Sequence, residues 1–254
     1  MPKRNTVQRR HQILQLLALH GHVHVDALAR ELMTSEVTVR KDLALLEQGG
    51  LLLRRYGGAI PLPSELTESS GAITPQKKAI AKKAAELIRD HNRILIDFGS
   101  TTGALIPELS HKRGLVVMTN SLHVANAVRE LDNEPTLLLS GGTWDPHSES
   151  FQGKIAETVI ASYDFDQLFI GCDGIDIERG TTTFNELMQL SQVMASAARE
   201  VIVMAESNKI GRRIPNLELS WTSIDHLITD QHLTADQHQH IEQQGVQIHC
   251  TSES

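Results

Sequence analysis

The sequence lacks the features that mark membrane, secreted and disulfide-stabilised proteins. No run of uncharged apolar residues approaches the roughly 18 that a bilayer span needs, and the opening MPKR leads into a polar stretch rather than a signal-peptide core. Only two cysteines occur, Cys172 and Cys250, and neither has a CxxC partner, which excludes a disulfide framework or a cysteine zinc site. We therefore expect a cytoplasmic protein whose two thiols are reduced and buried.

Catalytic and cofactor motifs are equally scarce. The sequence contains no Walker-type phosphate loop and no Ser-His-Asp or Cys-His arrangement. Histidine is frequent, with 13 residues, but His20, His22 and His24 alternate around a turn, whereas metal ligation needs convergent geometry. We expect no metal, no cofactor and no catalytic residue.

Charge is divided unevenly along the 254 residues. Residues 1–60 hold nine Lys/Arg against five Asp/Glu, a balance of +4, and the remaining residues hold 15 against 26, a balance of −11, which together give the net −7. The length and the ordinary composition, with 40% apolar residues, predict two domains. A basic head on an acidic body indicates that the head binds a polyanion.

Three helical patterns and a short wing occupy the head. Apolar residues at helical spacing predict helices over 8–20, 25–33 and 36–48, with a Thr-Ser pair as the N-cap of the third. The run 51–58 that follows ends in a glycine pair, which is typical of a β-hairpin. Residues 1–60 are therefore predicted to form a winged helix-turn-helix.

The third helix presents a basic, hydrogen-bonding face. If Val39 and Leu43 face the core, the opposite side points outward, where a recognition helix meets the major groove of DNA. Arg40 suits a guanine edge or a phosphate, and Lys41 suits a phosphate. The alternative, solvated charges on a small helical bundle, is disfavoured because charge sign, turn residues and wing agree. The predicted DNA-binding residues are Ser35, Glu36, Thr38, Arg40 and Lys41 and, on the wing, Arg54, Arg55 and Tyr56.

A proline-rich segment separates the head from the body. Residues 61–75 contain three of the eight prolines without an apolar period, so we expect a linker. Residues 76–254 then form the second domain, which starts with a helix over 76–90. Beyond this helix, short apolar runs alternate with helical stretches, which is typical of a parallel sheet covered on both faces. The predicted strands are 94–97, 115–118, 136–139, 167–170, 201–204, 227–228 and 246–248.

Polar, glycine-rich loops follow several of these strands. Ligands of open α/β sheets bind beyond the carboxyl ends of the strands, so the loops predict one shared cleft, although each loop alone is compatible with a simple turn. Segment 97–102 joins a strand end to a hydroxyl-rich helix start, which suits a phosphate, and plain N-capping by Ser100 is the alternative. Lys209 supplies a compensating cation. The predicted effector-binding residues are Asp97, Gly99, Ser100, Thr101, Thr102, Asn120, Gly141, Gly142, Asp173 and Lys209.

At these residues the chain resembles the DeoR family of bacterial transcriptional regulators. The segments VRKDL at 39–43 and RRYGG at 54–58 match its DNA-binding motif, with Lys41 where the family more often has a second arginine. Within the family, the chain is most similar to sorbitol (glucitol) operon repressors over 180–186 and 198–201. The body segments that match the family are 96–102, 119–121, 141–142, 171–175 and 207–211.

The resemblance implies a repressor of a sugar or polyol catabolic operon, controlled by a phosphorylated sugar. It also implies an α/β fold class with an N-terminal winged helix-turn-helix and a C-terminal parallel-sheet domain resembling phosphosugar isomerases. That last similarity supplies a rival hypothesis, a phosphosugar isomerase-like enzyme with Asp173 or Glu186 as its base. A third alternative is an architectural DNA binder. A winged helix has no role in an isomerase and an architectural protein needs no acidic body, so we expect a regulator and not an enzyme.

Assembly follows from the size of one head. A single winged helix binds DNA weakly, whereas tethered heads gain from effective concentration and from paired half-sites. We therefore expect a homodimer or homotetramer assembled through the body, with double-stranded operator DNA as its partner and no membrane partner.

Overall fold

The computed structural model forms two compact units, Met1–Ser70 and Gly71–Ser254. It describes residues 6–20, 22–48, 52–55, 57–60, 73–145, 148–183, 189–212, 214 and 216–251. Most of the predicted linker, residues 61–72, lies outside this part of the chain. No helix among the described residues is long and apolar enough to cross a bilayer.

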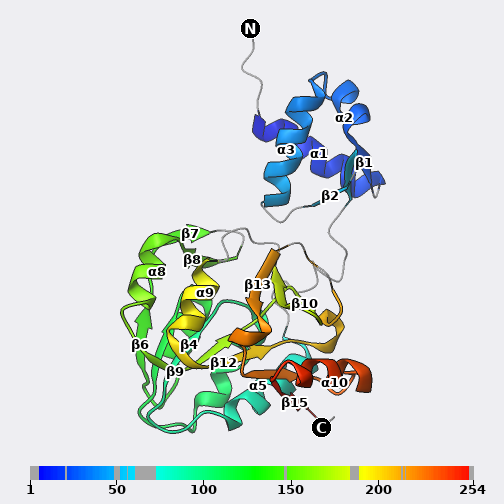
Figure 1. Cartoon of the computed structure of the whole chain (residues 1–254). Coiled ribbons are helices and arrows are strands. Elements are labelled where there is room, and N and C mark those ends of the chain that lie inside the picture. The colour runs from blue at the N-terminus through cyan, green and yellow to red at the C-terminus, as the bar shows by residue number, and fades with distance from the viewer. Residues whose placement is uncertain are drawn as a thin grey trace. The chain divides into compact units, whose positions relative to one another are not determined.

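The first unit is the predicted winged helix-turn-helix (Figure 1). Three strands form a small antiparallel sheet in the order β1-β3-β2, of which β1 is an addition to the predicted hairpin. The elements are α1 (Thr6–His20), β1 (Val23–His24), α2 (Val25–Glu31), α3 (Glu36–Gln48), β2 (Leu53–Arg55) and β3 (Gly58–Ile60).

One apolar cluster holds this unit together. Ile13 and Leu17 of α1 pack with Leu28 of α2 and with Val39 and Leu43 of α3. These positions repeat at the three- and four-residue spacing of a helix face, so each helix buries one stripe and exposes the other. Burial of Val39 and Leu43 confirms the expected orientation of α3.

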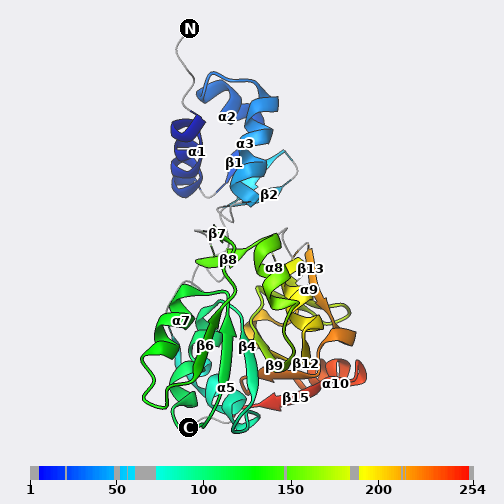
Figure 2. The ribbon, with the colours of Figure 1, turned by 90° about the vertical axis from the view of Figure 1, so that its left-hand side faces the viewer.

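The second unit is built on a seven-stranded sheet in the order β15-β14-β12-β9-β4-β5-β6 (Figure 2). Every pair of neighbours in it is parallel, as predicted. All seven predicted strands are present, as β4 (Arg93–Ile96), β5 (Val116–Thr119), β6 (Thr136–Leu139), β9 (Phe165–Ile170), β12 (Ala198–Met204), β14 (His226–Thr229) and β15 (Gln247–Cys250).

Both faces of this sheet are covered, which explains the continuous apolar character of its strands. Consecutive residues of one strand point into different cores: in β9, Leu168 belongs to one apolar cluster and Phe169 to the other. One core receives side chains from α5, α7 and the 3-10 helix Ile106–Leu109, which follows α6, and the other from α8, α9 and α10. These helices are α5 (Pro75–Glu86), α6 (Ser100–Gly103), α7 (Leu122–Arg129), α8 (Lys154–Ile160), α9 (Gln189–Ser196) and α10 (Ala235–Gln243).

Two smaller sheets were not predicted. A hairpin is formed by β7 (Thr143–Asp145) and β8 (Ser150–Gln152), and an antiparallel sheet by β10 (Gly174–Asp176), β11 (Gly180–Thr183) and β13 (Asn216–Ser220). Four of these strands have only three or four residues, too few for a sequence pattern to detect, whereas β13 reads Asn-Leu-Glu-Leu-Ser, an alternation of polar and apolar residues that was missed.

The two cysteines differ in their surroundings. Cys172 is buried, as expected, whereas Cys250 is exposed at the end of the edge strand β15, so the prediction of two buried thiols is wrong for Cys250. An edge strand has a neighbour on one side only, and its last residue is left open to solvent.

Candidate functional site: a DNA-binding helix and a sensor cleft

Helix α3 presents the predicted outward face. Ser35 caps it, because its hydroxyl accepts a hydrogen bond from the Thr38 backbone N–H over 3.2 Å. Ser35, Glu36, Arg40 and Lys41 are exposed and Thr38 is half-buried. This places hydrogen-bonding and charged groups on one side of a helix whose other side is core, the arrangement of a helix that reads a major groove.

Arg40 and the wing arginine Arg54 each have an acidic neighbour. Arg40 Nη2 lies 2.7 Å from Glu36 Oε2, and Arg54 Nε lies 3.7 Å from Glu47 Oε2. Both pairs are largely exposed, so each is weak and exchangeable for a phosphate or a base edge. Tyr56 and the side chain of Arg55 fall outside the described residues.

Val37 is a member of this face that the sequence reading missed. Its side chain is 61% exposed although it is apolar and lies in the first turn of α3. An apolar side chain at such a position suits the methyl group of thymine. The signal was present in the sequence, because Val37 lies off the stripe defined by Val39 and Leu43.

Two arginines of the basic head have a structural role. Arg9 and Arg10 both bind the buried carboxylate of Asp42, Arg10 over 2.9 Å. Asp42 lies on α3 and the arginines on α1, so this network fixes the recognition helix against the first helix. Breaking a buried ion pair costs about 3–5 kcal/mol, and this position therefore supports the DNA-binding face without belonging to it.

In the second unit, the carboxyl ends of neighbouring strands bring the predicted effector residues together. Asp97 follows β4 and Asn120 follows β5, and the Asn120 amide donates to Asp97 Oδ1 over 2.8 Å. Burial is the largest influence on Asp97 and raises its pKa to about 7, opposed by hydrogen bonds from the Phe98 backbone and from Asn120. The nearby Asp173 carboxylate raises the pKa further.

The hydroxyl loop, Gly99–Thr102, differs from its prediction in one respect. The helix expected from Thr101 onward is the four-residue α6, so it has almost no macrodipole to offer an anion. Gly99 at φ 133° makes the turn that introduces it. Thr102 Oγ1 donates to the Gly99 carbonyl over 3.0 Å, and Thr101 and Thr102 are buried. The alternative, plain N-capping by Ser100, is wrong, because the N-cap residue of α6 is Gly99 and Ser100 is the first residue of the helix.

Gly141 and Gly142 connect β6 to the β7–β8 hairpin. A Cβ on Gly142 would lie 2.7 Å from the Gln152 carbonyl, so close approach of two backbone segments requires this glycine. A Cβ on Gly141 would meet no atom within 4 Å, although its positive φ of 61° favours glycine. Gly142 thus has a packing role, and the structure gives it no role specific to a ligand.

Lys209 and Asp173 meet at the end of β9. Lys209 Nζ donates to the Cys172 carbonyl over 2.6 Å, and Thr183 Oγ1 donates to Asp173 Oδ2 over 2.8 Å. Burial raises the pKa of the Cys172 thiol to about 12, and the Lys209 charge opposes this. Lys209, in the turn after β12, therefore bonds the residue that precedes Asp173 in the segment after β9.

A second lysine near this point was missed. The Lys77 side chain on α5 is only 2% exposed, and desolvation lowers its pKa, with Glu206 opposing this and Lys209 adding to it. The sequence does not single out Lys77, because three other lysines, Lys78, Lys82 and Lys83, share that helix. Glu206, whose charge acts on Lys77, lies 129 residues later in the chain, so no local pattern links the two.

Glu218 of β13 is the second missed residue. It is 9% exposed, and burial raises its pKa to about 8, with the charges of Asp97 and Asp173 adding to the rise. Ser191 Oγ donates to its Oε1 over 2.8 Å. The signal that could have found it is the polar–apolar alternation of residues 216–220, which indicates a strand but was not used.

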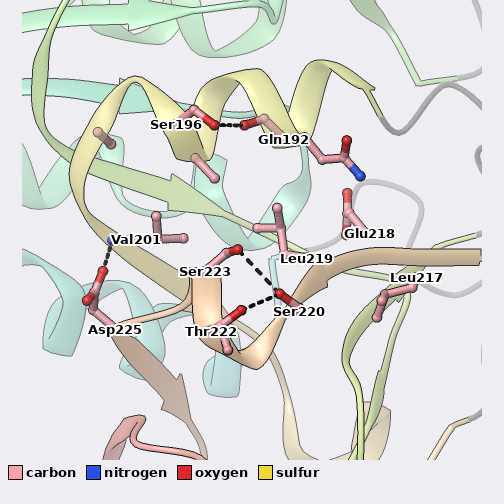
Figure 3. A pocket seen from close by; sticks show the side chains of 12 residues that line it. Gln192, Ser196, Val201, Leu217, Glu218, Leu219, Ser220, Thr222, Ser223 and Asp225 are labelled. Carbon is pink, nitrogen blue, oxygen red and sulfur yellow. Dashed lines mark hydrogen bonds between the residues drawn. The ribbon is translucent and has the colours of Figure 1, made fainter.

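A groove of about 420 Å³ lies elsewhere in the second unit (Figure 3). It runs between α9 and the β13 end, with Gln192 on one side and Ser220 on the other. It includes the first residue of β12, Ala198, so it lies at the amino ends of the strands and not at the predicted carboxyl ends. Glu218 stands at one end of it.

Comparison with known proteins gives two family matches. The model of the DeoR-like helix-turn-helix domain matches residues 9–65, and that of the DeoR C terminal sensor domain matches residues 73–231. Among described residues, no group of three or more His, Cys, Asp or Glu that could hold a metal ion is found.

Relatives align along almost the whole chain. A candidate transcriptional repressor of the aga operon from Escherichia coli O157:H7 is 36% identical over 96% of this chain and 93% of its own. The transcriptional regulator GlpR of Haloferax volcanii is 33% identical, covering 95% and 96%, and the lactose phosphotransferase system repressor of Lactococcus lactis is 30% identical, covering 94% and 95%. Ribose 5-phosphate isomerase A from Methanocaldococcus jannaschii shares 18% identity over 53% of each chain with a TM-score of 0.39, too low to infer an activity.

A winged helix-turn-helix followed by a ligand-sensing α/β unit defines a DNA-binding transcriptional regulator, and the predicted fold class is confirmed. The chain belongs to the DeoR family of these regulators. The sorbitol subtype is not among the names of the relatives above.

Proposed function

We propose that this regulator is a repressor of a sugar or polyol catabolic operon whose operator binding is controlled by a phosphorylated sugar. The observation that carries the proposal is the meeting of Lys209, Asp173, Asp97 and Asn120 at the carboxyl ends of neighbouring strands in the sensor unit. Two relatives are named as repressors, one of the aga operon and one of a lactose phosphotransferase system. The sorbitol (glucitol) operon is our candidate within this class.

In this proposal the head reads the operator through α3. Ser35, Glu36, Thr38 and Arg40 face base edges, while Lys41 and the wing residues Arg54, Arg55 and Tyr56 hold the backbone phosphates. Exposure of the four α3 residues Ser35, Glu36, Arg40 and Lys41 supports the assignment. Direct contact of Arg40 with a base requires that it leave Glu36, which an exposed pair allows at little cost.

The effector phosphate lies near Lys209 in this proposal. The hydroxyl loop Gly99–Thr102 supplies backbone N–H groups, together with the Ser100 and Thr101 hydroxyls, and Lys209 supplies the charge. Gly141 belongs to the same row of strand ends, and Gly142 supports it by packing. Because the four-residue α6 has almost no dipole, Lys209 and not the helix supplies the positive charge that attracts the phosphate.

Signal transfer starts at α5. Its N-cap Thr74 is bonded to Glu206, and the charges of Glu206 and Lys209 both act on Lys77. An anion that binds Lys209 offsets the charge that acts on Lys77 and therefore affects the first turn of α5, the first helix after the proline-rich segment. A homodimer or homotetramer formed through the sensor unit then changes the placement of its heads.

The isomerase alternative receives less support. Its candidate base Asp173 accepts a hydrogen bond from Thr183, and Glu186 lies outside the described residues. The relatives that align along the whole chain are named as regulators or repressors. A regulator binds the phosphosugar without turning it over.

Calorimetry on the full chain tests the proposal. Matched pairs of sugars and sugar 6-phosphates are titrated into the protein, and products are then analysed by NMR. We expect binding of phosphorylated compounds only, without turnover, and a change in operator affinity by the compound that binds. Conversion of the ligand, or equal affinity for sugar and sugar phosphate, contradicts the proposal.

A further inference from the structure

Two buried polar atoms near the proposed effector site, which is formed by Asp97, Asn120, Asp173 and Lys209, have no hydrogen-bond partner among the described residues. They are Asn120 Oδ1 and Glu218 Oε2. Asn120 is completely buried and Glu218 is 9% exposed. A buried acceptor without a donor costs about 1–3 kcal/mol, and native proteins keep few of them. Atoms of this kind at a binding site are explained when a ligand supplies the missing donors.

Both atoms belong to one row of acceptors. The Asn120 amide nitrogen donates to Asp97, the charge of Asp97 acts on Glu218, and the charge of Asp173 acts on both carboxyls. The four residues come from four different strands or strand ends, at β5, β4, β13 and β9. The fold therefore brings together side chains that are distant in the sequence. Burial of their carboxyl groups lowers the stability of the folded state.

Cations lie near the same strand end. The charges of Lys209 and Arg212, as well as those of Glu218 and Asp173, act on the Cys172 thiol, so both kinds of charge are close to this residue. A ligand that fits has an anion at one end and hydrogen-bonding groups at the other. Sugar hydroxyls suit the second end, because they both donate and accept and so match a carboxyl in either protonation state.

We propose that Glu218, with Asn120 and Asp97, binds effector hydroxyl groups remote from the phosphate and thereby determines which phosphosugar is recognised. The inference rests on the proposed function, since it assigns the other end of the effector to Lys209. A site built to hydrogen-bond a hydroxyl discriminates strongly against an analogue that lacks it, because the buried groups are then left unpaired. Phosphate binding alone would give no such selectivity.

A purely structural role for Glu218 makes a different prediction. Its bond from Ser191 joins β13 to α9, so Glu218 would then hold two elements together. Loss of that link would lower stability and weaken every ligand alike. Ligand selectivity would not change.

The test compares full-length parent, Glu218→Leu and Glu218→Gln, with Glu130→Gln as a control on the exposed end of α7. Calorimetry measures affinity for inorganic phosphate and for a panel of hexose and hexitol 6-phosphates. We expect the best panel compound to bind the parent at least about 10-fold more tightly than inorganic phosphate, by roughly 1.4 kcal/mol. Glu218→Leu should reduce this preference by about 10- to 100-fold and leave phosphate affinity unchanged. Glu218→Gln, which still donates and accepts, should lose less.

Deoxy analogues of the best compound provide a measurement that does not depend on variant folding. Removal of the hydroxyl that faces Glu218 should weaken binding to the parent by about 10-fold or more, and the same removal should have little effect in Glu218→Leu, which cannot bond that hydroxyl. The inference is overturned if no panel compound exceeds inorganic phosphate, if every deoxy analogue binds like its parent compound, or if Glu218→Leu keeps its preference. A parent that binds neither phosphate nor any panel compound contradicts the proposed function instead.

Discussion

The Thr74 hydroxyl donates a hydrogen bond to a Glu206 carboxylate oxygen over 3.0 Å. Thr74 is the N-cap of α5, and Glu206 immediately precedes the 3-10 turn Ser207–Lys209. The first helix of the sensor unit is thus tied to the turn that carries the candidate phosphate cation. In the proposed function, this contact is the link between occupation of the site and the position of the α5 start.

Replacing Thr74 with Val should break this link. The variant loses the cap that accepts from the Lys77 N–H as well as the bond to Glu206, and we expect its free energy of unfolding to fall by about 1 kcal/mol. Effector affinity should stay near that of the parent while the effector-dependent change in operator affinity becomes smaller. Denaturation and operator titrations measure both. Thr158→Val, at an exposed helical hydroxyl, is the control, and a full effector response in Thr74→Val would contradict the link.

Arg40→Ala should weaken operator binding by about 1–3 kcal/mol if Arg40 reads a base. Its exposed pair with Glu36 contributes little to folding, so the melting temperature should hardly change. Titrations on operator and on random DNA separate the roles. Equal losses on both would make Arg40 a phosphate contact, and no loss on either would remove it from the interface. Arg129→Ala, in an exposed pair of the sensor unit, serves as the control.

Operator affinity should fall steeply as salt rises. The head has a balance of +4 and the remainder −11, so binding depends on local phosphate contacts that release counterions. The slope of log affinity against log salt should be about −0.9 for each phosphate neutralised, and Lys41→Ala should make the slope shallower by about one such step. An unchanged slope in that variant would exclude Lys41 from the phosphate contacts.

Sequence patterns predicted the elements whose signals are local. The seven parallel strands were found because continuous apolar runs such as 201–204 need both faces covered, and α3 because Val39 and Leu43 repeat at helical spacing. The short strands β10 and β11 escaped, since Gly, Thr and Asp in three- or four-residue runs resemble a loop. β11 pairs with β13, which lies more than 30 residues away, and β10 pairs with β11.

The residues of the candidate site likewise fall into two groups, those that a local sequence pattern predicted and those that it did not. Asp97, Asn120, Asp173 and Lys209 were recognisable as polar residues at strand ends. Glu218 was not, because its place beside Asp97 depends on a strand that enters from a different sheet. Burial of Lys77 and Asp42 likewise comes from distant partners, which no local pattern encodes.

Stability of the sensor unit should fall between about pH 4 and pH 8 on account of Glu218 and Asp97. Burial raises the pKa of Glu218 to about 8 and that of Asp97 to about 7, so the folded state keeps protons that the unfolded state loses. Unfolding free energy decreases wherever the folded state binds more protons. Glu218→Gln removes one contribution, so its stability relative to the parent should rise from pH 5 to pH 8 by more than about 1 kcal/mol, the equivalent of one pKa unit. Denaturation at the two pH values measures this, and Glu130→Gln should show no such rise.

The account as a whole depends on separate sites for operator and effector in one chain. Operator binding is therefore measured with increasing phosphosugar for the parent and for Lys209→Ala, using the compound that binds the parent best. We predict equal operator affinity without effector, and a requirement for about 10- to 100-fold more phosphosugar in Lys209→Ala, because one charge-assisted contact of roughly 1.5–3 kcal/mol is lost. An identical phosphosugar requirement in the two proteins, or an equal response of the parent to the unphosphorylated sugar, would contradict the phosphate-sensing role of this unit.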